Sequence, residues 1–195
     1  EIASCLVGSE MCIRDRYLSK TFSLYLHYKS IKTTFQTKII MNNKNLMNHA
    51  ADNIRILAVS MVEKAKSGHP GGAMGGADFI NVLFSEFLVY DPNNPEWEGR
   101  DRFYLDPGHM SPMLYSALAM QGKYTIDELK EFRQWGSVTP GHPERDIRHG
   151  IENTSGPLGQ GHTYAVGAAI AEKFLEARLS HTMMQHLSLI HISEP

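Results

Sequence analysis

The sequence predicts an α/β domain that is cut short before most of its sheet. Segments with the apolar spacing of amphipathic helices make up most of the patterned part of the chain. Loops rich in glycine and proline separate them, since 14 of the 16 glycines lie between Gly68 and Gly161. One short run, Arg102–Leu105, has the character of a strand and is soon followed by a Pro-Gly turn. Helices with an occasional short strand favour an α/β architecture.

Composition argues against two broad classes of protein. The 195-residue chain has a formal net charge of -2, whereas a nucleic-acid-binding protein has a clustered basic surface. No apolar run approaches the roughly 18 residues that a membrane-spanning helix needs. Cys5 and Cys12 are the two cysteines, so a disulfide framework or a cysteine metal cage is not expected. A body without cysteine fits a cytoplasmic protein.

Charge and pattern divide the chain into three parts. Residues 1–40 carry six basic and three acidic side chains, against 13 basic and 18 acidic ones in the remainder. We expect residues 1–40 to be a non-native or disordered leader, because no sustained helical or strand period occurs there. Met41 is the natural start of the body, residues 41–179. Residues 180–195 lose the pattern again and are expected to be a non-native or disordered tail.

Two helices are predicted in the first half of the body. The first has one apolar stripe made of Ile54, Leu57, Ala58, Met61, Val62 and Ala65. Gly68 stands where this helix should stop, and Pro70 prevents its continuation. The second should span residues 78–89, with Asp78 as its N-cap. Apolar side chains cover most of its circumference, so we expect it to be buried.

Three more helices are predicted further along. One spans residues 111–120. Thr125 and Glu128 have the spacing of a capping box, which predicts a helix start there. After a loop-rich stretch over residues 136–161, an alanine-rich helix is predicted over residues 163–178. The apolar face of that last helix comprises Val166, Ile170, Phe174 and Ala177.

Four histidines, each directly after a glycine, are the candidate functional residues: His69, His109, His142 and His162. Each lies at a predicted boundary between elements, where binding residues often converge. A glycine lets the backbone approach a ligand, and an imidazole can give or take a proton near pH 7. Their sequence intervals of 40, 33 and 20 residues match no local zinc-ligand spacing, so zinc is disfavoured. For each one taken alone, a hydrogen-bonded loop histidine is the simpler interpretation.

The run Gly156–Gly161, with sequence GPLGQG, directly precedes a predicted helix. Such loops can offer free backbone N–H groups and the positive end of a helix dipole to an anion or a cofactor. This one lacks the Lys-Ser/Thr ending of a phosphate-binding loop and the spacing of a dinucleotide fingerprint. A plain turn is an equally good interpretation of the loop by itself.

Taken together, four motifs resemble the N-terminal part of transketolases: SGHPGG at Ser67–Gly72, DPGHMS at Asp106–Ser111, FRQWGS to TPGHPE across Phe132–Glu144, and SGPLGQG at Ser155–Gly161. Their order and spacing match as well as their residues, over about residues 46–179. The resemblance implies a thiamine-diphosphate-binding fold, a parallel sheet flanked by helices, of which mainly the N-terminal helices and loops are present. It also implies a thiamine diphosphate enzyme that moves a two-carbon ketol unit from a ketose phosphate to an aldose phosphate.

The same resemblance implies roles for individual residues. His69 and His142 would be catalytic, the first assisting proton transfer and the second binding hydroxyl groups of the donor sugar. His109 would lie near the cofactor diphosphate. Gly156, Pro157 and Leu158 would contact the cofactor, with Leu158 supporting its bent shape. His162 stands where many relatives have a small apolar residue, so we assign it a packing role.

Two features of the family are not found in this sequence. One is the Gly-Asp-Gly segment, whose aspartate helps to hold magnesium; the other is the glutamate that activates the aminopyrimidine. We therefore assign no metal ligand and expect this chain to be inactive alone, although the family implies a magnesium cofactor. Family enzymes are homodimers with the active site between two subunits.

Three alternatives stay open at the level of sequence. The first is a related thiamine enzyme of similar architecture, either deoxyxylulose-phosphate synthase or dihydroxyacetone synthase. The motifs TPGHPE and FRQWGS argue against deoxyxylulose-phosphate synthase. A non-catalytic, partner-binding subunit of a split enzyme is the second. A bare structural or metal-binding helical domain is the third and the least favoured.

Overall fold

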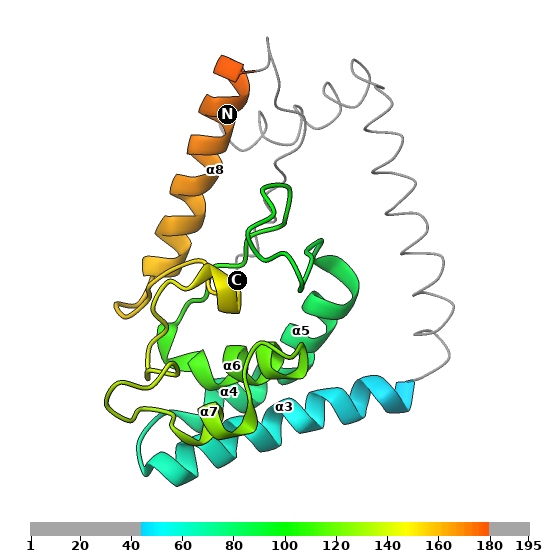
Figure 1. Cartoon of the computed structure of the whole chain (residues 1–195), viewed down its shortest axis with the longest axis vertical. Coiled ribbons are helices and arrows are strands. Elements are labelled where there is room, and N and C mark those ends of the chain that lie inside the picture. The colour runs from blue at the N-terminus through cyan, green and yellow to red at the C-terminus, as the bar shows by residue number, and fades with distance from the viewer. Residues whose placement is uncertain (1–43, 180–195) are drawn as a thin grey trace. The chain divides into compact units, whose positions relative to one another are not determined.

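The computed structural model describes residues 44–179, and the expected leader 1–40 and tail 180–195 lie outside the described residues (Figure 1). Residues 44–155, here called the bundle region, contain five α-helices and the loops between and after them, and helix α8 follows. The α-helices are α3 (Lys44–Ala65), α4 (Pro70–Gly75), α5 (Ala77–Val82), α6 (Ser111–Met120), α7 (Ile126–Lys130) and α8 (Gln160–Leu179). The shorter helical segments are the π-helix η1 (Leu83–Phe87) and the 3₁₀ helices η2 (Gly108–Met110) and η3 (Ile147–His149).

Helix α3 packs with the stripe that its sequence predicts. Ala51, Ile54, Ala58 and Met61 are buried, and they recur at the three- and four-residue spacing of one helix face. The chain leaves the helix after Ala65, and Gly68 adopts a φ of +131°, which glycine tolerates best. Both the predicted apolar face of this helix and its predicted end before Gly68 are confirmed.

Helix α6 is the centre of the core. Its residues from Ser111 to Leu118 are all buried, and the helix contacts α4, α5 and α7. Tyr115 stacks edge-on against Tyr124 and Phe132, with ring centroids 5.4 and 6.3 Å apart. The predicted helix over residues 111–120 is confirmed at both ends.

Helix α4 was not predicted, because its sequence, PGGAMG, contains three glycines and one proline. Pro70 occupies the first turn, where its missing N–H costs nothing, so it starts this helix as well as ending the previous one. A Cβ on Gly76, just after α4, would lie 2.5 Å from Met113 Sδ. Glycine at this position therefore permits the close approach of α4 to α6. Helix propensities do not take such a contact between helices into account.

The predicted helix over residues 78–89 is helical to Phe87 but differs in three respects. It begins one residue earlier, at Ala77, and changes to π-helical hydrogen bonding at Leu83. Asp78 is not its N-cap, because its carboxylate pairs with Arg55 of α3 instead. The expected full burial is wrong as well: Ile80, Leu83 and Leu88 are buried, whereas Phe79, Val82 and Phe87 are exposed.

The capping box at the start of α7 is confirmed. The Glu128 N–H donates to Thr125 Oγ1 at 3.2 Å, and the Thr125 N–H donates to Glu128 Oε2 at 2.7 Å. Leu129 and Phe132 are buried as expected.

The strand expected at Arg102–Leu105 does not form. The described residues contain no strand, and one isolated antiparallel bridge joins Asp146 to Ile151. The Leu105 backbone is instead satisfied by the Asn153 side chain: its N–H donates to Asn153 Oδ1 at 3.1 Å, and its carbonyl accepts from Asn153 Nδ2 at 3.3 Å. A side-chain amide here takes the place of a neighbouring strand.

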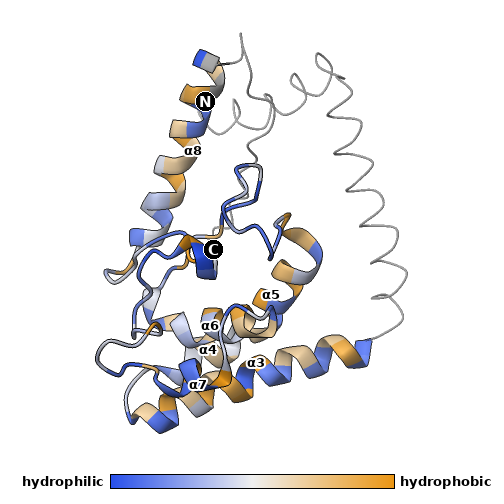
Figure 2. Ribbon diagram, viewed as in Figure 1, coloured by the Kyte–Doolittle hydropathy of each residue, from blue (hydrophilic) through white to orange (hydrophobic). Residues whose placement is uncertain are grey.

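Helix α8 begins three residues before the predicted start. Unlike α6, it leaves many of its large apolar side chains exposed to solvent. Tyr164, Val166, Ile170, Phe174 and Leu175 are exposed. Figure 2 shows hydrophobic positions along the length of α8. Across residues 44–179, none of the helices is both long and apolar enough to cross a membrane.

Candidate functional site

Two of the predicted histidines lie side by side. His69 precedes α4 in an extended conformation, and His109 lies in the 3₁₀ helix η2 just before α6. Their ring centroids are 4.7 Å apart and the rings are tilted by 46°. The contact between α4 and η2 thus brings together residues that are 40 positions apart in sequence.

The loop that carries His142 is held by hydrogen bonds from helix α6. Ser111 Oγ donates to the Gly141 carbonyl at 2.7 Å, and Tyr115 Oη donates to the Pro140 carbonyl at 2.8 Å. Because both donors belong to the buried face of α6, they fix the turn before His142 against the core.

Arg133 links this loop to the turn before His69, and sequence reasoning missed it. Its backbone N–H donates to the Thr139 carbonyl at 3.0 Å, and its Nη1 donates to Ser67 Oγ at 2.9 Å. A Cβ on Gly141 would lie 2.5 Å from Arg133 Nε, so the guanidinium passes directly over that glycine. Arg133 has a φ of +61°, which is uncommon for a residue with a side chain and which the FRQWGS motif does not reveal.

The electrostatics of the cluster act most clearly on His142. Partial desolvation is the largest cause that lowers the pKa of its imidazole, and nearby positive charge lowers it further. The nearby charges are those of Arg133, His109 and His69. His142 therefore favours its neutral form, in which one ring nitrogen donates and the other accepts a hydrogen bond.

Ser155 joins the glycine-rich loop to the histidine loops. Its backbone N–H donates to the Pro143 carbonyl at 3.1 Å, next to His142. A Cβ on Gly108 would lie 2.8 Å from both the carbonyl oxygen and Oγ of Ser155, so the backbone before His109 touches the start of the loop. The structure thus connects the four motifs through hydrogen bonds and close backbone contacts.

The next loop residues, Gly156, Pro157 and Leu158, project from this anchor. Leu158 is 75% exposed, and a Cβ on Gly156 would meet no atom within 4 Å. The described contacts do not bring the Leu158 side chain against His69, His109 or His142. The loop therefore offers open space and an apolar side chain.

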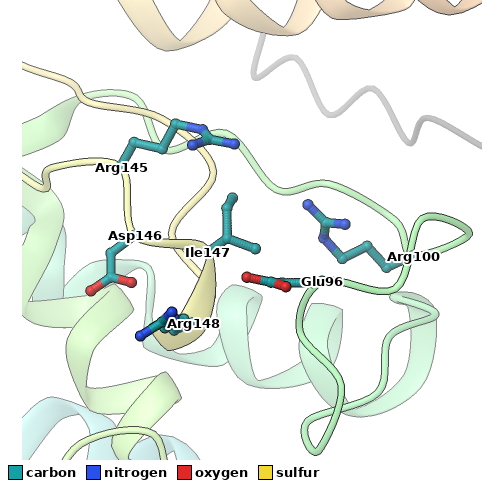
Figure 3. A pocket seen from close by; sticks show the side chains of 6 residues that line it. All are labelled: Glu96, Arg100, Arg145, Asp146, Ile147 and Arg148. Atoms are coloured by element: carbon teal, nitrogen blue, oxygen red, sulfur yellow. The ribbon is translucent and has the colours of Figure 1, made fainter.

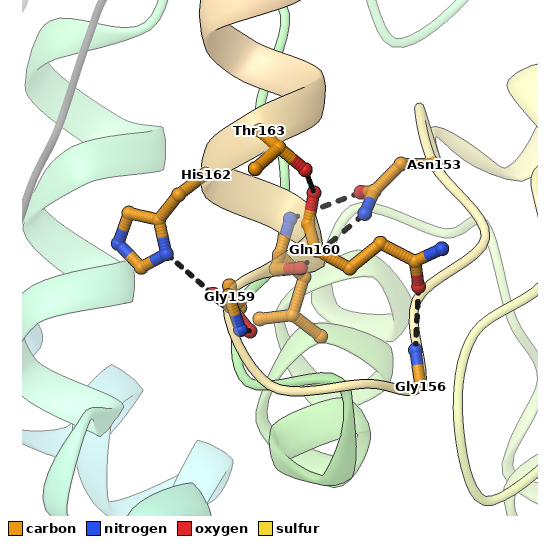
Figure 4. A network of polar contacts seen from close by, with 8 residues as sticks. Asn153, Gly156, Gly159, Gln160, His162 and Thr163 are labelled. Carbon is orange, nitrogen blue, oxygen red and sulfur yellow. Dashed lines mark hydrogen bonds and ion pairs between the residues drawn. The ribbon is translucent and has the colours of Figure 1, made fainter.

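The expectation of free N–H donors is wrong for two positions of this loop, as Figure 4 shows. The Gly156 N–H donates to Gln160 Oε1 at 3.1 Å, and the Gly159 N–H donates to Asp106 Oδ1 at 3.2 Å. Side chains of the protein already satisfy both donors, so these two N–H groups are not available as an anion cradle.

His162 has a polar partner in addition to any packing role. Its Nδ1 pairs with Oδ2 of Asp106, which is 6% exposed at its side chain, whereas the imidazole is 52% exposed. Asp106 is the first residue of the DPGHMS motif, but the sequence alone predicted no role for it. A pairing between residues 56 positions apart leaves no local pattern in the sequence.

A polar cavity of about 410 Å³ lies away from the histidine cluster and is lined by none of the predicted site residues (Figure 3). Its lining comprises Glu96, Arg100, Arg145, Asp146, Ile147 and Arg148. Arg100 within it forms an ion pair with Glu152, whose Oε1 lies 2.7 Å from Arg100 Nε. In the part of the chain that the structure describes, no group of three or more His, Cys, Asp or Glu side chains could hold a metal ion.

Three histidine-bearing segments and a glycine-rich loop that opens a helix are joined by hydrogen bonds and close backbone contacts, an arrangement typical of a binding domain. The chain belongs to the transketolase family: residues 46–192 match the family described as "Transketolase, thiamine diphosphate binding domain". This confirms the resemblance carried by the four motifs. The expected parallel sheet is not among the described residues.

The relatives are transketolases, and this chain matches a part of each. It is 50% identical over 140 residues to transketolase-1, chloroplastic, of Arabidopsis thaliana, a match that covers 71% of this chain and 19% of that protein. It is 49% identical over 150 residues to transketolase 1 of Vibrio vulnificus, covering 75% of this chain and 23% of that one. The chain thus spans about a fifth of the length of these relatives.

Solved structures of transketolases are similar to this chain as well. The transketolase from Leishmania mexicana superposes with a TM-score of 0.65 at 48% identity, over 68% of this chain and 20% of that one. The transketolase from Campylobacter jejuni gives a TM-score of 0.64 at 44% identity, over 69% and 21%.

The described residues fit a thiamine diphosphate molecule in two ways. Ser155 Oγ and Arg133 Nε are buried without a hydrogen-bond partner, and both belong to the connected loops of the site. The open Gly156 and the exposed Leu158 leave room for an apolar contact with a heteroaromatic ring. Buried polar groups that lack a partner, together with an open position and an exposed apolar side chain, suit a ligand with polar and aromatic parts.

Proposed function

We propose that this chain contributes the N-terminal part of a transketolase active site, which transfers a two-carbon ketol unit between sugar phosphates. The observation that carries this proposal is the convergence of the His69, His109 and His142 loops in a chain of this family. Thiamine diphosphate, when bound, supplies the carbon nucleophile for the ketose carbonyl. The chain's own residues must orient the sugar and move its protons.

His142 and His69 are the proposed catalytic residues. The lowered pKa of His142 keeps its imidazole neutral near pH 7, so that it can accept a hydrogen bond from one hydroxyl group of the donor sugar. His69, 4.7 Å from His109 by ring centroids, would exchange a proton with a substrate hydroxyl. Positioned imidazoles of this kind contribute roughly 10²–10⁴-fold to a rate.

The remaining assignments concern the cofactor. His109 would contact the diphosphate, and Gly156, Pro157 and Leu158 would line the aminopyrimidine side, with Leu158 in van der Waals contact. Magnesium, a homodimer and a cytoplasmic location belong to the proposal by family resemblance, although the Arabidopsis relative is named as chloroplastic. No residue of this chain is assigned as a magnesium ligand.

A chimeric enzyme tests the proposal. Residues 46–179 of this chain would replace the aligned segment of Vibrio vulnificus transketolase 1, and ketol transfer between sugar phosphates would be measured. We expect an active enzyme whose kcat falls at least about 10²-fold in the His142→Ala and His69→Ala variants. His49→Ala, at an exposed position of α3, is the matched control and should retain activity.

The isolated 195-residue chain is expected to give no ketol transfer with thiamine diphosphate and magnesium. Turnover by that chain would disprove the claim that it is inactive alone. A chimera that folds and dimerises but has no activity would disprove the assignment of the segment.

A further inference from the structure

We infer that Asp106 and His162 form a positioning pair that holds the glycine-rich loop in the shape the cofactor needs, an inference that rests on the proposed function. The two oxygens of one carboxylate are used in different ways. Asp106 Oδ1 accepts the Gly159 N–H at 3.2 Å, and Asp106 Oδ2 pairs with His162 Nδ1 (Figure 4). The side chain that makes both contacts is almost fully buried.

Asp106 acts as an N-terminal cap for α8, supplied by a distant segment of the chain. Gly159 directly precedes the first residue of α8, and its N–H would otherwise lack an intrahelical partner. A carboxylate at this end of a helix both accepts such a donor and interacts favourably with the helix dipole. The cap therefore fixes where the loop ends and the helix begins.

Backbone contacts reinforce the pair. Gly159 has a φ of +84°, in the left-handed region. A Cβ on Gly161 would collide with the Leu105 carbonyl, so the first turn of α8 lies directly on the segment that carries Asp106. The loop is thus clamped at its C-terminal end by Asp106 and anchored at its N-terminal end by Ser155.

The pair also connects two parts of the proposed cofactor site. Asp106 precedes His109 by three residues, and His162 follows Leu158 by four. A movement of the loop relative to His109 must therefore break the contact of Asp106 with Gly159 or with His162. His162 acts through Asp106 rather than on the cofactor, so it is a positioning residue and not a catalytic one.

Two measurements test the pair. The first is the hydrogen-exchange rate of the Gly159 amide in the 195-residue chain. The second is the affinity of the chimeric enzyme for thiamine diphosphate at fixed magnesium. Asp106→Ala should raise the exchange rate and weaken cofactor affinity, each by roughly five- to tenfold, the size of a lost helix cap. His162→Ala should have a smaller effect on both, of about threefold, as for a partly exposed ion pair.

Conservative variants separate positioning from simple destabilisation. Asp106→Asn keeps an oxygen acceptor for Gly159, and His162→Asn keeps a donor near the place of Nδ1, so each should restore most of the loss seen in the alanine variant. Asp146→Asn is the matched control, because Asp146 and His149 form another Asp–His pair, at 2.5 Å, away from the loop. If Asp106→Ala does not fold, His162→Ala and Asp106→Asn provide the comparison.

The outcomes are distinct. If the unmodified chimera does not bind thiamine diphosphate, the proposed function fails. If it binds, and the Asp106→Ala and His162→Ala variants match it in affinity, the positioning role is overturned while the proposed function stands. Unchanged exchange at Gly159 in these variants also overturns the role, because the contact would then not hold the loop.

Discussion

Helices α6 and α8 are both rich in apolar residues, yet they occupy opposite environments. Every residue of α6 from Ser111 to Leu118 is buried, whereas α8 leaves five large apolar side chains exposed, from Tyr164 to Leu175. Local sequence predicted both helices, since each is rich in apolar residues and has few helix breakers. Burial depends instead on what packs against a helix, and among the described residues the partners of α6 are present while little covers α8.

The same contrast holds for the proposed site residues. His69, His109 and His142 lie on loops that the bundle region holds by hydrogen bonds, such as Ser111 to Gly141 at 2.7 Å. Leu158, near the start of α8, is exposed. The bundle region therefore holds the histidine-bearing segments, and the junction with α8 leaves Leu158 of the glycine-rich loop exposed.

The largest expected effect compares one phenylalanine in each region. Phe132 is 1% exposed and packs against Tyr115, whereas Phe174 in α8 is 55% exposed. Phe132→Ala should lower the free energy of unfolding by about 4 kcal/mol, because it removes buried contacts and leaves a cavity. Phe174→Ala should change it by less than about 0.5 kcal/mol. Urea unfolding of both variants would reveal any such difference, and equal losses would mean that α8 is packed as tightly as the core.

An ion pair gives the next largest effect. Arg100 and Glu152 are 12% and 10% exposed at their side chains and tie the segment before Asp106 to the segment before Ser155. Arg100→Gln should lower the free energy of unfolding by about 2 kcal/mol, because it leaves Glu152 largely buried without its charge partner. Arg178→Gln in α8, where the guanidinium lies over an exposed Phe174 ring, is the matched control and should be close to neutral. Similar values for the two arginines would contradict the difference between the regions.

The capping box of α7 should give a smaller effect. Thr125→Ala removes the side-chain acceptor of the Glu128 N–H and should cost about 1 kcal/mol of unfolding free energy. Thr163→Ala is the counterpart in α8, where the hydroxyl donates to the Gln160 carbonyl and caps no free N–H. Thermal melts of the two variants should separate by a few degrees, and the Thr125 variant should be the less stable.

His142 should make the folded chain less stable as the pH falls. Its folded pKa lies below the ordinary histidine value, so on acidification the unfolded chain takes up its proton before the folded one. The contribution of His142 to stability is therefore present at neutral pH and is lost as the pH falls through the ordinary histidine range. His142→Gln should flatten this part of the stability profile, and an unaltered slope would show that the imidazole is not perturbed.

Sequence reasoning succeeded where the cause is local. The stripe of α3, the extent of α6 and the capping box at Thr125 depend on residues within a few positions of one another. The expectation that the glycine-flanked histidines converge came from their positions at element boundaries and from the family resemblance, and the structure brings the rings of His69 and His109 together. The structure adds that their loops share hydrogen-bonding partners.

What sequence reasoning missed depends on contacts between distant residues. Gly76 allows a close approach of α4 to α6 only because Met113 lies opposite. Asp78 leaves its expected capping position because Arg55 is within reach, and Asp106 meets His162 across 56 positions. The left-handed conformation of Arg133 likewise follows from its bonds to Thr139 and Ser67 and has no signature in its own residue type.

The most direct test of the central claim, that the bundle region brings the three histidines into one site, is an NMR titration of the His142 ring protons in the 195-residue chain. The account predicts a midpoint below the ordinary histidine value. It also predicts that the midpoint moves upward in Arg133→Gln and that the ring signals of His142 shift in His109→Gln. An ordinary midpoint that neither variant changes would contradict the claim, because it would place His142 apart from the other two loops.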